Sequence, residues 1–115
     1  MTIVVAGEVD LPADSREAAL LGAKSWIEAA LAERGCRHYA WSADPHNLKR
    51  AHVFEKWECA KDLAVHLRGP AYFGMLGHLS SFSILGADTR KYRVDLTEPV
   101  YGANGVASAE FVTKK

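Results

Sequence analysis

The sequence predicts a small α+β domain whose elements follow the order β–α–β–β–α–β. Two observations support this fold class: four segments have the β-branched or alternating pattern of strands, and the segments between them repeat apolar residues every three to four positions, as helices do. The chain has 115 residues, which is the size of one domain. Because 49% of the residues are hydrophobic and 24% are charged, the composition is that of a globular protein and excludes a disordered one.

The first strand and the first helix are expected before residue 36. Residues 3–9 are β-branched and apolar, which predicts an inner strand. Asp14 and Glu17 then have the spacing of a capping box at a helix start, and Gly35 stands where a C-terminal cap belongs. Because apolar residues recur at helical intervals between these signals, we expect one helix over residues 14–34.

Two alternating segments joined by a turn predict an antiparallel hairpin. Residues 36–43 and 50–57 both alternate, and the Asp-Pro-His-Asn sequence at 44–47 has turn chemistry. In the second of these strands, Glu55 and Trp57 fall on the same side.

The second half of the chain predicts two further helices and a last strand. Residues 58–68 have helical spacing, and Gly69 and Pro70 end that helix. A short helix over residues 71–79 and a strand over residues 90–96 follow. The resulting order is that of the ferredoxin-like fold, in which an antiparallel four-stranded sheet carries its helices on one face only.

The other face of such a sheet needs a cover that a single chain does not supply. Aromatic residues such as Tyr39, Trp41, Phe54 and Tyr92, or their alternates, are candidates for this open face. The simplest solution is a two-fold homodimer in which two sheets face each other.

The charge balance agrees with self-association. Lysine and arginine together number 14, as do aspartate and glutamate, so the formal net charge is zero. A neutral chain lacks the basic patch that binds nucleic acid or an anionic membrane surface, and nothing keeps its copies apart electrostatically. We therefore expect a homodimer, no nucleic-acid partner and no membrane partner.

The expected compartment is the cytoplasm. No signal-peptide pattern is visible at the N-terminus, and no apolar run approaches the roughly 20 residues of a membrane span. Cys36 and Cys59 are too few for a disulfide framework, so both are expected as reduced thiols.

A segment follows the last predicted strand. Six of the 19 residues in the segment 97–115 are Gly, Ala or Ser. We therefore expect one domain over residues 1–96 and a C-terminal extension over residues 97–115, which either pairs with the partner subunit or stays flexible.

Two titratable residues stand out as candidates for acid–base chemistry. His66 falls on the inward face of its helix, where it is either a packed core residue or a general base or hydrogen-bond donor. Glu55 shares the side of its strand with Trp57, and a carboxylate in an apolar setting needs a partner or a raised pKa. That partner is either His66 or an arginine.

Several aromatic residues are candidates for the walls of a binding site, with ordinary packing as the alternative for each. Trp57 suits a flat aromatic ligand, and Tyr72 and Phe73 suit a pocket mouth. Tyr39 and Tyr92 suit either the pocket or a dimer interface. The five histidines show no metal-ligand spacing, and no phosphate-binding loop or nucleophile elbow occurs, so we expect no metal and no other cofactor.

The chain also resembles a known family. Residues 54–58 read Phe-Glu-Lys-Trp-Glu, and Leu63, His66 and the Gly-Pro-Ala-Tyr-Phe sequence at 69–73 follow. This ordered set is similar to the antibiotic biosynthesis monooxygenase superfamily, in particular to its small quinol-monooxygenase-like members. The resemblance covers about residues 3–96.

The resemblance implies a dimeric α+β barrel with a pocket between sheet and helices in each subunit. Some members of the family oxygenate quinols, anthrones or related phenols with O₂ and no metal or flavin, while others cleave haem or isomerise small metabolites. The sequence departs from the family pattern at Cys59, where a small polar residue is common, and at Ala71, where a histidine is common.

The function that these observations favour is oxidation of a small quinol, anthrone or related phenolic compound with O₂ by a monooxygenase that needs no cofactor. His66 would be the base and Glu55 would orient it, with Trp57, Tyr72 and Phe73 as walls. The alternatives are a non-catalytic dimeric domain that binds a small ligand, and an isomerase or haem-degrading enzyme of the same superfamily. The sequence does not identify the substrate.

Overall fold

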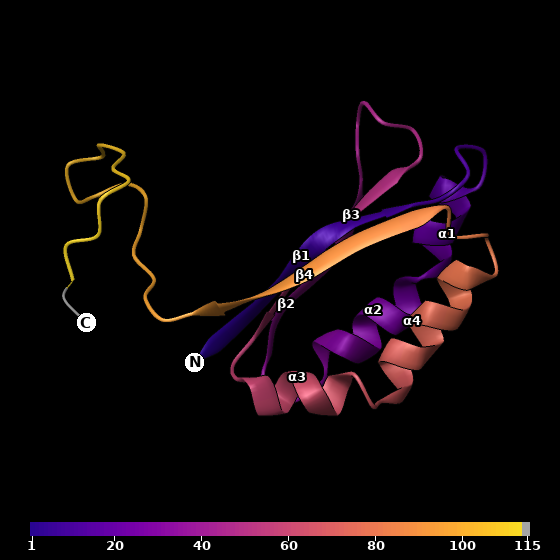
Figure 1. The fold of residues 1–115 in the computed structure, drawn as a ribbon, viewed down its shortest axis with the longest axis horizontal. Coiled ribbons are helices and arrows are strands. Elements are labelled where there is room, and N and C mark those ends of the chain that lie inside the picture. Colours follow the sequence, from indigo (N-terminus) through magenta and orange to yellow (C-terminus); the bar gives the residue numbers. More distant parts are fainter. Residues whose placement is uncertain (114–115) are drawn as a thin grey trace.

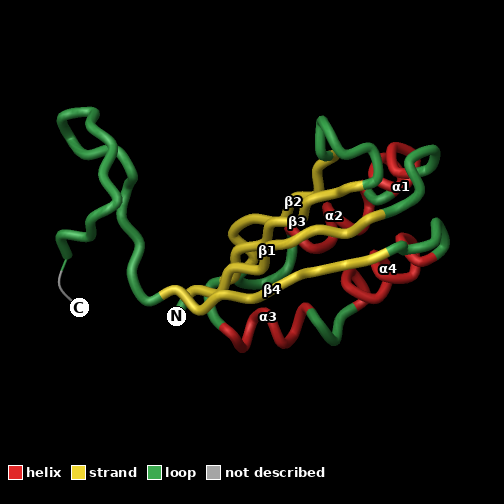
Figure 2. The backbone as a smooth tube through the Cα atoms, turned by 45° about the horizontal axis from the view of Figure 1, so that its top comes forward, coloured by secondary structure: helices red, strands yellow, loops and turns green. Residues whose placement is uncertain are grey.

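The computed structural model describes residues 1–113, and it contains a four-stranded antiparallel sheet with four helices on one face (Figures 1 and 2). Neighbouring strands lie in the order β2-β3-β1-β4, and each pair is antiparallel. The predicted α+β ferredoxin-like fold is therefore confirmed. The elements are β1 (Thr2–Asp10), α1 (Arg16–Gly22), α2 (Lys24–Leu31), β2 (Cys36–Ala43), β3 (Arg50–Trp57), α3 (Ala60–His66), α4 (Pro70–Ser80) and β4 (Gly86–Val94).

The prediction of one helix over residues 14–34 is wrong, because that segment contains two helices that meet at Ala23. The side chain of His78 explains the break. Its Nε2 donates a hydrogen bond of 2.8 Å to the carbonyl oxygen of Ala19, which would otherwise accept from the N–H of Ala23. That N–H instead bonds to the carbonyl of Leu20 at 3.3 Å, which tightens the last turn of α1.

The last strand begins four residues before its predicted start at residue 90 and ends at Val94. Pairing with β1 extends it, from Gly86 opposite Asp10 to Val94 opposite Thr2. Glycine and aspartate near the start of the strand favour a turn when they are read locally. The ladder to β1 overrides that preference.

Two of the four aromatic residues expected on the open face lie elsewhere. A bulge between Cys36 and His38 shifts the register of β2. Tyr39 and Trp41 consequently lie on the helix-covered face and pack against the core. Phe54 and Tyr92 do lie on the open face, and both are substantially exposed there.

The core lies between the helices and the covered face of the sheet. Alternation along β3 buries Val53, Glu55 and Trp57 on that face. Trp57, Leu11 and His66 are the largest fully buried side chains among the described residues. The core therefore includes a histidine and a glutamate, two groups that are costly to bury without partners.

Helices α2 and α4 pack closely through a glycine, and this contact allows a test of the fold. A Cβ atom at Gly74 would lie 2.3 Å from a ring carbon of Trp26, whereas a Cβ atom at Gly77 would meet nothing within 4 Å. We expect Gly74→Ala to lower the free energy of unfolding by about 1–2 kcal/mol, because the overpacking penalty exceeds the gain in helix propensity.

Gly77→Ala, on the same helix, is the matched control. It gains helix propensity without a clash, so it should raise stability by up to about 1 kcal/mol. Urea unfolding of the two variants beside the parent chain measures both changes. A Gly74→Ala variant as stable as Gly77→Ala would contradict this packing of α2 on α4.

Beyond β4 the chain runs away from the body (Figures 1 and 2). The accessible surface is 7,800 Å², whereas a compact chain of this mass would expose about 6,200 Å². The radius of gyration is 16.2 Å, against about 13 Å for a compact domain of this length. No helix within residues 1–113 is long and apolar enough to cross a membrane.

Candidate active site

His66 lies at the C-terminal end of α3, where it stands between two carboxylates. Its side chain is 1% exposed. Nδ1 lies 2.5 Å from Oε1 of Glu33, and Nε2 lies 3.9 Å from Oε1 of Glu55. A carboxylate that accepts from one ring nitrogen fixes the tautomer and orientation of an imidazole. Glu33 thus holds His66 with Nε2 directed toward Glu55.

Glu33 reaches this position through the turn that follows α2. The turn passes through Gly35 in the left-handed conformation, with φ of +78°. A Cβ atom at Gly35 would lie 2.1 Å from the carboxylate of Asp62 on α3. The glycine therefore allows the close approach of this turn to α3, which brings Glu33 to His66.

Glu55 occupies the middle of β3 on the covered face, opposite Val5 on β1 and Tyr39 on β2. The indole N–H of Trp57 donates to its Oε1 at 3.0 Å. Burial raises the pKa of Glu55 above its usual value, and the charge of Glu33 raises this pKa further, while the Trp57 hydrogen bond and His66 act in the opposite direction. Of the two partners proposed from the sequence for Glu55, His66 is the one that this geometry brings near.

Three of the aromatic candidates surround the imidazole. The ring of Trp57 lies 4.6 Å from that of His66, between centroids, and the rings of Tyr39 and Tyr72 lie at 5.6 and 5.9 Å. The hydroxyl of Tyr39 is buried, which raises its pKa to about 12 and keeps it protonated at neutral pH. The ring cluster shields His66 from water.

The other two aromatic candidates lie outside this cluster. Phe73 contacts Tyr72 but points outward and is more than half exposed. Tyr92 lies on the open face of the sheet, on the side away from the helices. The sequence-based candidates therefore divide into a buried group around His66 and two surface residues.

A cavity of about 270 Å³ opens beside this group, between β4 and the helices. Glu55 and Tyr72 form part of its wall, whereas His66 lies behind Glu55 and does not reach it. The full lining consists of Val5, Glu55, Leu63, Leu67, Tyr72, Thr89, Arg90 and Lys91. Glu55 is thus the member of the buried pair that a ligand in this cavity would touch.

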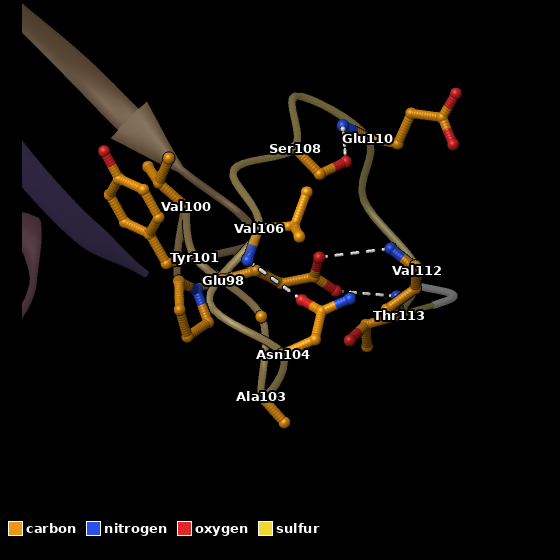
Figure 3. A pocket seen from close by; sticks show the side chains of 12 residues that line it. Glu98, Val100, Tyr101, Ala103, Asn104, Val106, Ser108, Glu110, Val112 and Thr113 are labelled. Carbon is orange, nitrogen blue, oxygen red and sulfur yellow. Dashed lines mark hydrogen bonds between the residues drawn. The ribbon is translucent and has the colours of Figure 1, made fainter.

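Larger hollows occur away from the buried pair. One of about 450 Å³ is lined only by residues of the segment 98–113 (Figure 3). Its carboxylate Glu98 already accepts hydrogen bonds from the backbone N–H groups of Val112 and Thr113. Because acid–base chemistry needs a positioned titratable group beside a cavity, the smaller cavity at Glu55 is the stronger candidate. Within residues 1–113, no group of three or more His, Cys, Asp or Glu side chains is placed to hold a metal ion.

Comparison with solved structures supports the fold. The chain superposes on a conserved protein from Methanosarcina mazei Go1 with a TM-score of 0.73 at 22% identity, covering 81% of this chain and 92% of that one. A candidate antibiotic biosynthesis monooxygenase from Deinococcus radiodurans gives a TM-score of 0.78 at 17% identity, covering 87% and 99%. Rv0793 from Mycobacterium tuberculosis gives 0.72 at 19%, covering 85% and 98%. At these identities the likeness concerns the fold alone.

The comparison with curated proteins finds no significant match. The family model for antibiotic biosynthesis monooxygenases, however, matches residues 2–73. This stretch is more than half of the chain, and it contains Glu33, Glu55, Trp57, His66 and Tyr72. The chain therefore belongs to the antibiotic biosynthesis monooxygenase family.

Proposed function

We propose that the protein is a cofactor-independent monooxygenase that oxidises a small quinol, anthrone or related phenolic compound with O₂. The observation that carries this proposal is a buried carboxylate, Glu55, on the wall of a largely apolar cavity with His66 directly behind it. Such a pair suits removal of a proton from a weak acid such as a phenol.

The proton acceptor in this proposal is the Glu55–His66 pair, with Glu55 as the member that touches substrate. The sequence alone suggested His66 as the base and Glu55 as its orienting group. What supports the exchanged roles is the burial of His66, whose side chain is 1% exposed. His66 then positions and stabilises Glu55, and Glu33 positions His66.

The reaction requires no electron carrier other than the substrate. Glu55 takes the phenolic proton, and the phenolate gives one electron to O₂, which forms superoxide and a substrate radical. These combine through a new carbon–oxygen bond, and Glu55 returns its proton to the peroxide. Loss of water from the hydroperoxide leaves a carbonyl on that carbon, so one oxygen atom enters the product and the other leaves as water.

The rest of the cavity suits such a substrate. Val5, Leu63 and Leu67 supply aliphatic walls, which accommodate an aromatic ring. The volume of about 270 Å³ lies near the lower end of the range for small-ligand sites. It therefore favours a small aromatic molecule of one to three rings over haem.

Oxygen consumption tests the proposal directly. The purified chain, freed of metal by a chelator and checked by absorbance for flavin and haem, is incubated with a panel of one-ring quinols and an anthrone in an oxygen-electrode cell. We expect one O₂ consumed per product formed. Ligands that bind in the cavity without any oxygen uptake would replace this proposal with the non-catalytic binding domain.

We also propose that the protein is a homodimer joined through the open face of the sheet. On that face Phe54 lies opposite Ala6, and Tyr92 lies opposite Val4, which makes an apolar strip across three strands. Light scattering at micromolar concentration should return twice the chain mass of 12.6 kDa. An interface of this kind should bury more than about 1,200 Å². A mass of one chain would contradict the dimer.

A further inference from the structure

The segment that follows β4 has an ordered shape of its own. We call residues 97–113 the arm. The backbone N–H of Gly102 bonds to the carbonyl of Val106 at 3.1 Å, and that of Ser108 bonds to the carbonyl of Val100 at 2.9 Å. Glu98 closes the loop by accepting from the backbone N–H groups of residues 112 and 113 (Figure 3).

The arm is held by itself and not by the body. Within residues 1–113, every hydrogen bond recorded for the arm joins two of its own residues. Figures 1 and 2 show it projecting beyond the end of β4, clear of the sheet and helices. This projecting arm also explains why the accessible surface of the chain exceeds that of a compact chain of the same mass.

The arm nevertheless carries the composition of a buried segment. Its large apolar side chains are 60–84% exposed, namely those of Val100, Tyr101, Val106, Phe111 and Val112. A disordered tail is poor in such residues, and an ordered segment that leaves them in water loses their hydrophobic stabilisation. The arm therefore has the chemistry of a surface that is covered in the assembled protein.

The rest of the chain indicates what covers it. The arm continues directly from β4, the strand that carries Tyr92 on the open face of the sheet. A two-fold pair of chains satisfies both needs at once, because each copy supplies one arm and one open face. An unrelated partner for the arm would leave the open face uncovered.

We propose that the arm docks reciprocally on a second copy of this chain, at the margin of its open sheet face, and clamps the homodimer. This inference rests on the homodimer proposed above. It does not depend on the oxygenase activity.

The test uses full-length variants with a matched control. In the arm variant, Val100→Ser is combined with Phe111→Ser. In the control, Leu21→Ser is combined with Leu48→Ser, which removes apolar side chains that are equally exposed but lie on the body. Sedimentation equilibrium gives the dimer dissociation constant of each, and circular dichroism checks that both retain the parent fold.

We expect the dimer dissociation constant of the arm variant to be at least about 100-fold higher than that of the parent chain. One aliphatic and one aromatic anchor, Val100 and Phe111, are lost from each of the two symmetric contacts. The control should match the parent. In the parent chain, the amide protons of Val106 and Ser108 should exchange faster with solvent on dilution below the dissociation constant.

The outcomes separate the two proposals. A parent dimer with an unchanged dissociation constant in the arm variant would overturn the arm contact and leave the homodimer intact. A monomeric parent chain would overturn both, and the oxygen assay would still stand by itself. The reciprocal contact would also be overturned if the parent chain formed assemblies larger than a dimer and the arm variant did not. An arm that docks on a second copy without receiving that copy's arm in return builds open chains.

Discussion

Glu55→Gln should lower the rate of oxygen consumption by about 10²–10⁴-fold, the usual loss when a positioned proton acceptor is removed. Glutamine keeps the size of the side chain, and its carbonyl oxygen can still accept the indole N–H of Trp57, which lies 3.0 Å from Oε1 in the parent chain. It cannot take a proton from substrate. Initial rates at saturating substrate, measured with an oxygen electrode, give the change in kcat.

The same substitution should leave the protein at least as stable at neutral pH. The folded state raises the pKa of Glu55, mainly through burial, so the folded chain binds this proton more tightly than the unfolded chain does. Stability therefore falls as pH rises from the unfolded pKa to the folded pKa, and the full cost remains above that range. Glutamine removes this cost. A variant that loses activity and also unfolds at much lower temperature would indicate a structural role instead.

The pH–rate profile is a second test of Glu55 as the proton acceptor. Because the ionised form of Glu55 accepts the proton, activity should rise with pH through its pKa, which lies above the usual value. The negative charge of Glu33 contributes to that increase. Glu33→Gln should consequently move the rising limb to lower pH. An unchanged limb would remove Glu33 from the network around His66.

The local pattern of the sequence was sufficient to predict that Glu55 and His66 lie on the inward-facing sides of their elements. Strict alternation in β3 predicted that Glu55 and Trp57 share one face, and helical spacing predicted that His66 points inward. Both predictions are confirmed by the burial of these residues. Periodicity works here because each element has one covered side, so burial follows directly from position.

The sequence did not indicate Glu33, for a physical reason. Helical spacing continued to residue 34 would place it on the polar, solvent-facing stripe. The helix ends at Leu31 instead, and the left-handed turn at Gly35 brings Glu33 to a residue 33 positions away. The glycine signal predicted the turn, but no local pattern encodes which helix that turn approaches.

The cavity wall was missed for a similar reason. Thr89 lines the cavity from a part of β4 that precedes the predicted start of this strand at residue 90. Its strand conformation depends on pairing with β1, which lies some 80 residues earlier in the chain. Long-range pairing also decides on which face Tyr39 lies, through the bulge in β2.

His66→Ala should have the second large effect, and it should act on both rate and stability. The substitution removes the ring that separates Glu33 from Glu55 and leaves a cavity beside Trp57. Loss of a buried partner between two carboxylates, together with the cavity, should lower the free energy of unfolding by about 3 kcal/mol. The rate of oxygen consumption should fall by about 10²-fold or more, because Glu55 loses the group that positions it and stabilises its charge.

His78→Ala is the matched control for this change. His78 is also a helical histidine with a hydrogen bond to a distant segment, the carbonyl of Ala19, but it lies outside the cavity wall. Its loss should lower the unfolding temperature, by about 4 °C or more for each kcal/mol in a domain of this size, and leave kcat near that of the parent chain. Thermal unfolding and oxygen uptake, measured on the same preparations, separate the two effects.

Imidazole added to the solution decides between a role in proton transfer and a role in packing alone. The space left in His66→Ala adjoins Glu55, so a free imidazole molecule can occupy it and restore the contact to the carboxylate. We expect added imidazole to recover part of the lost rate in His66→Ala and none in Glu55→Gln, where the proton acceptor itself is missing. A His66→Ala variant with the full rate of the parent chain and only a lower unfolding temperature would show that His66 is a packed core residue and would leave Glu55 to act alone.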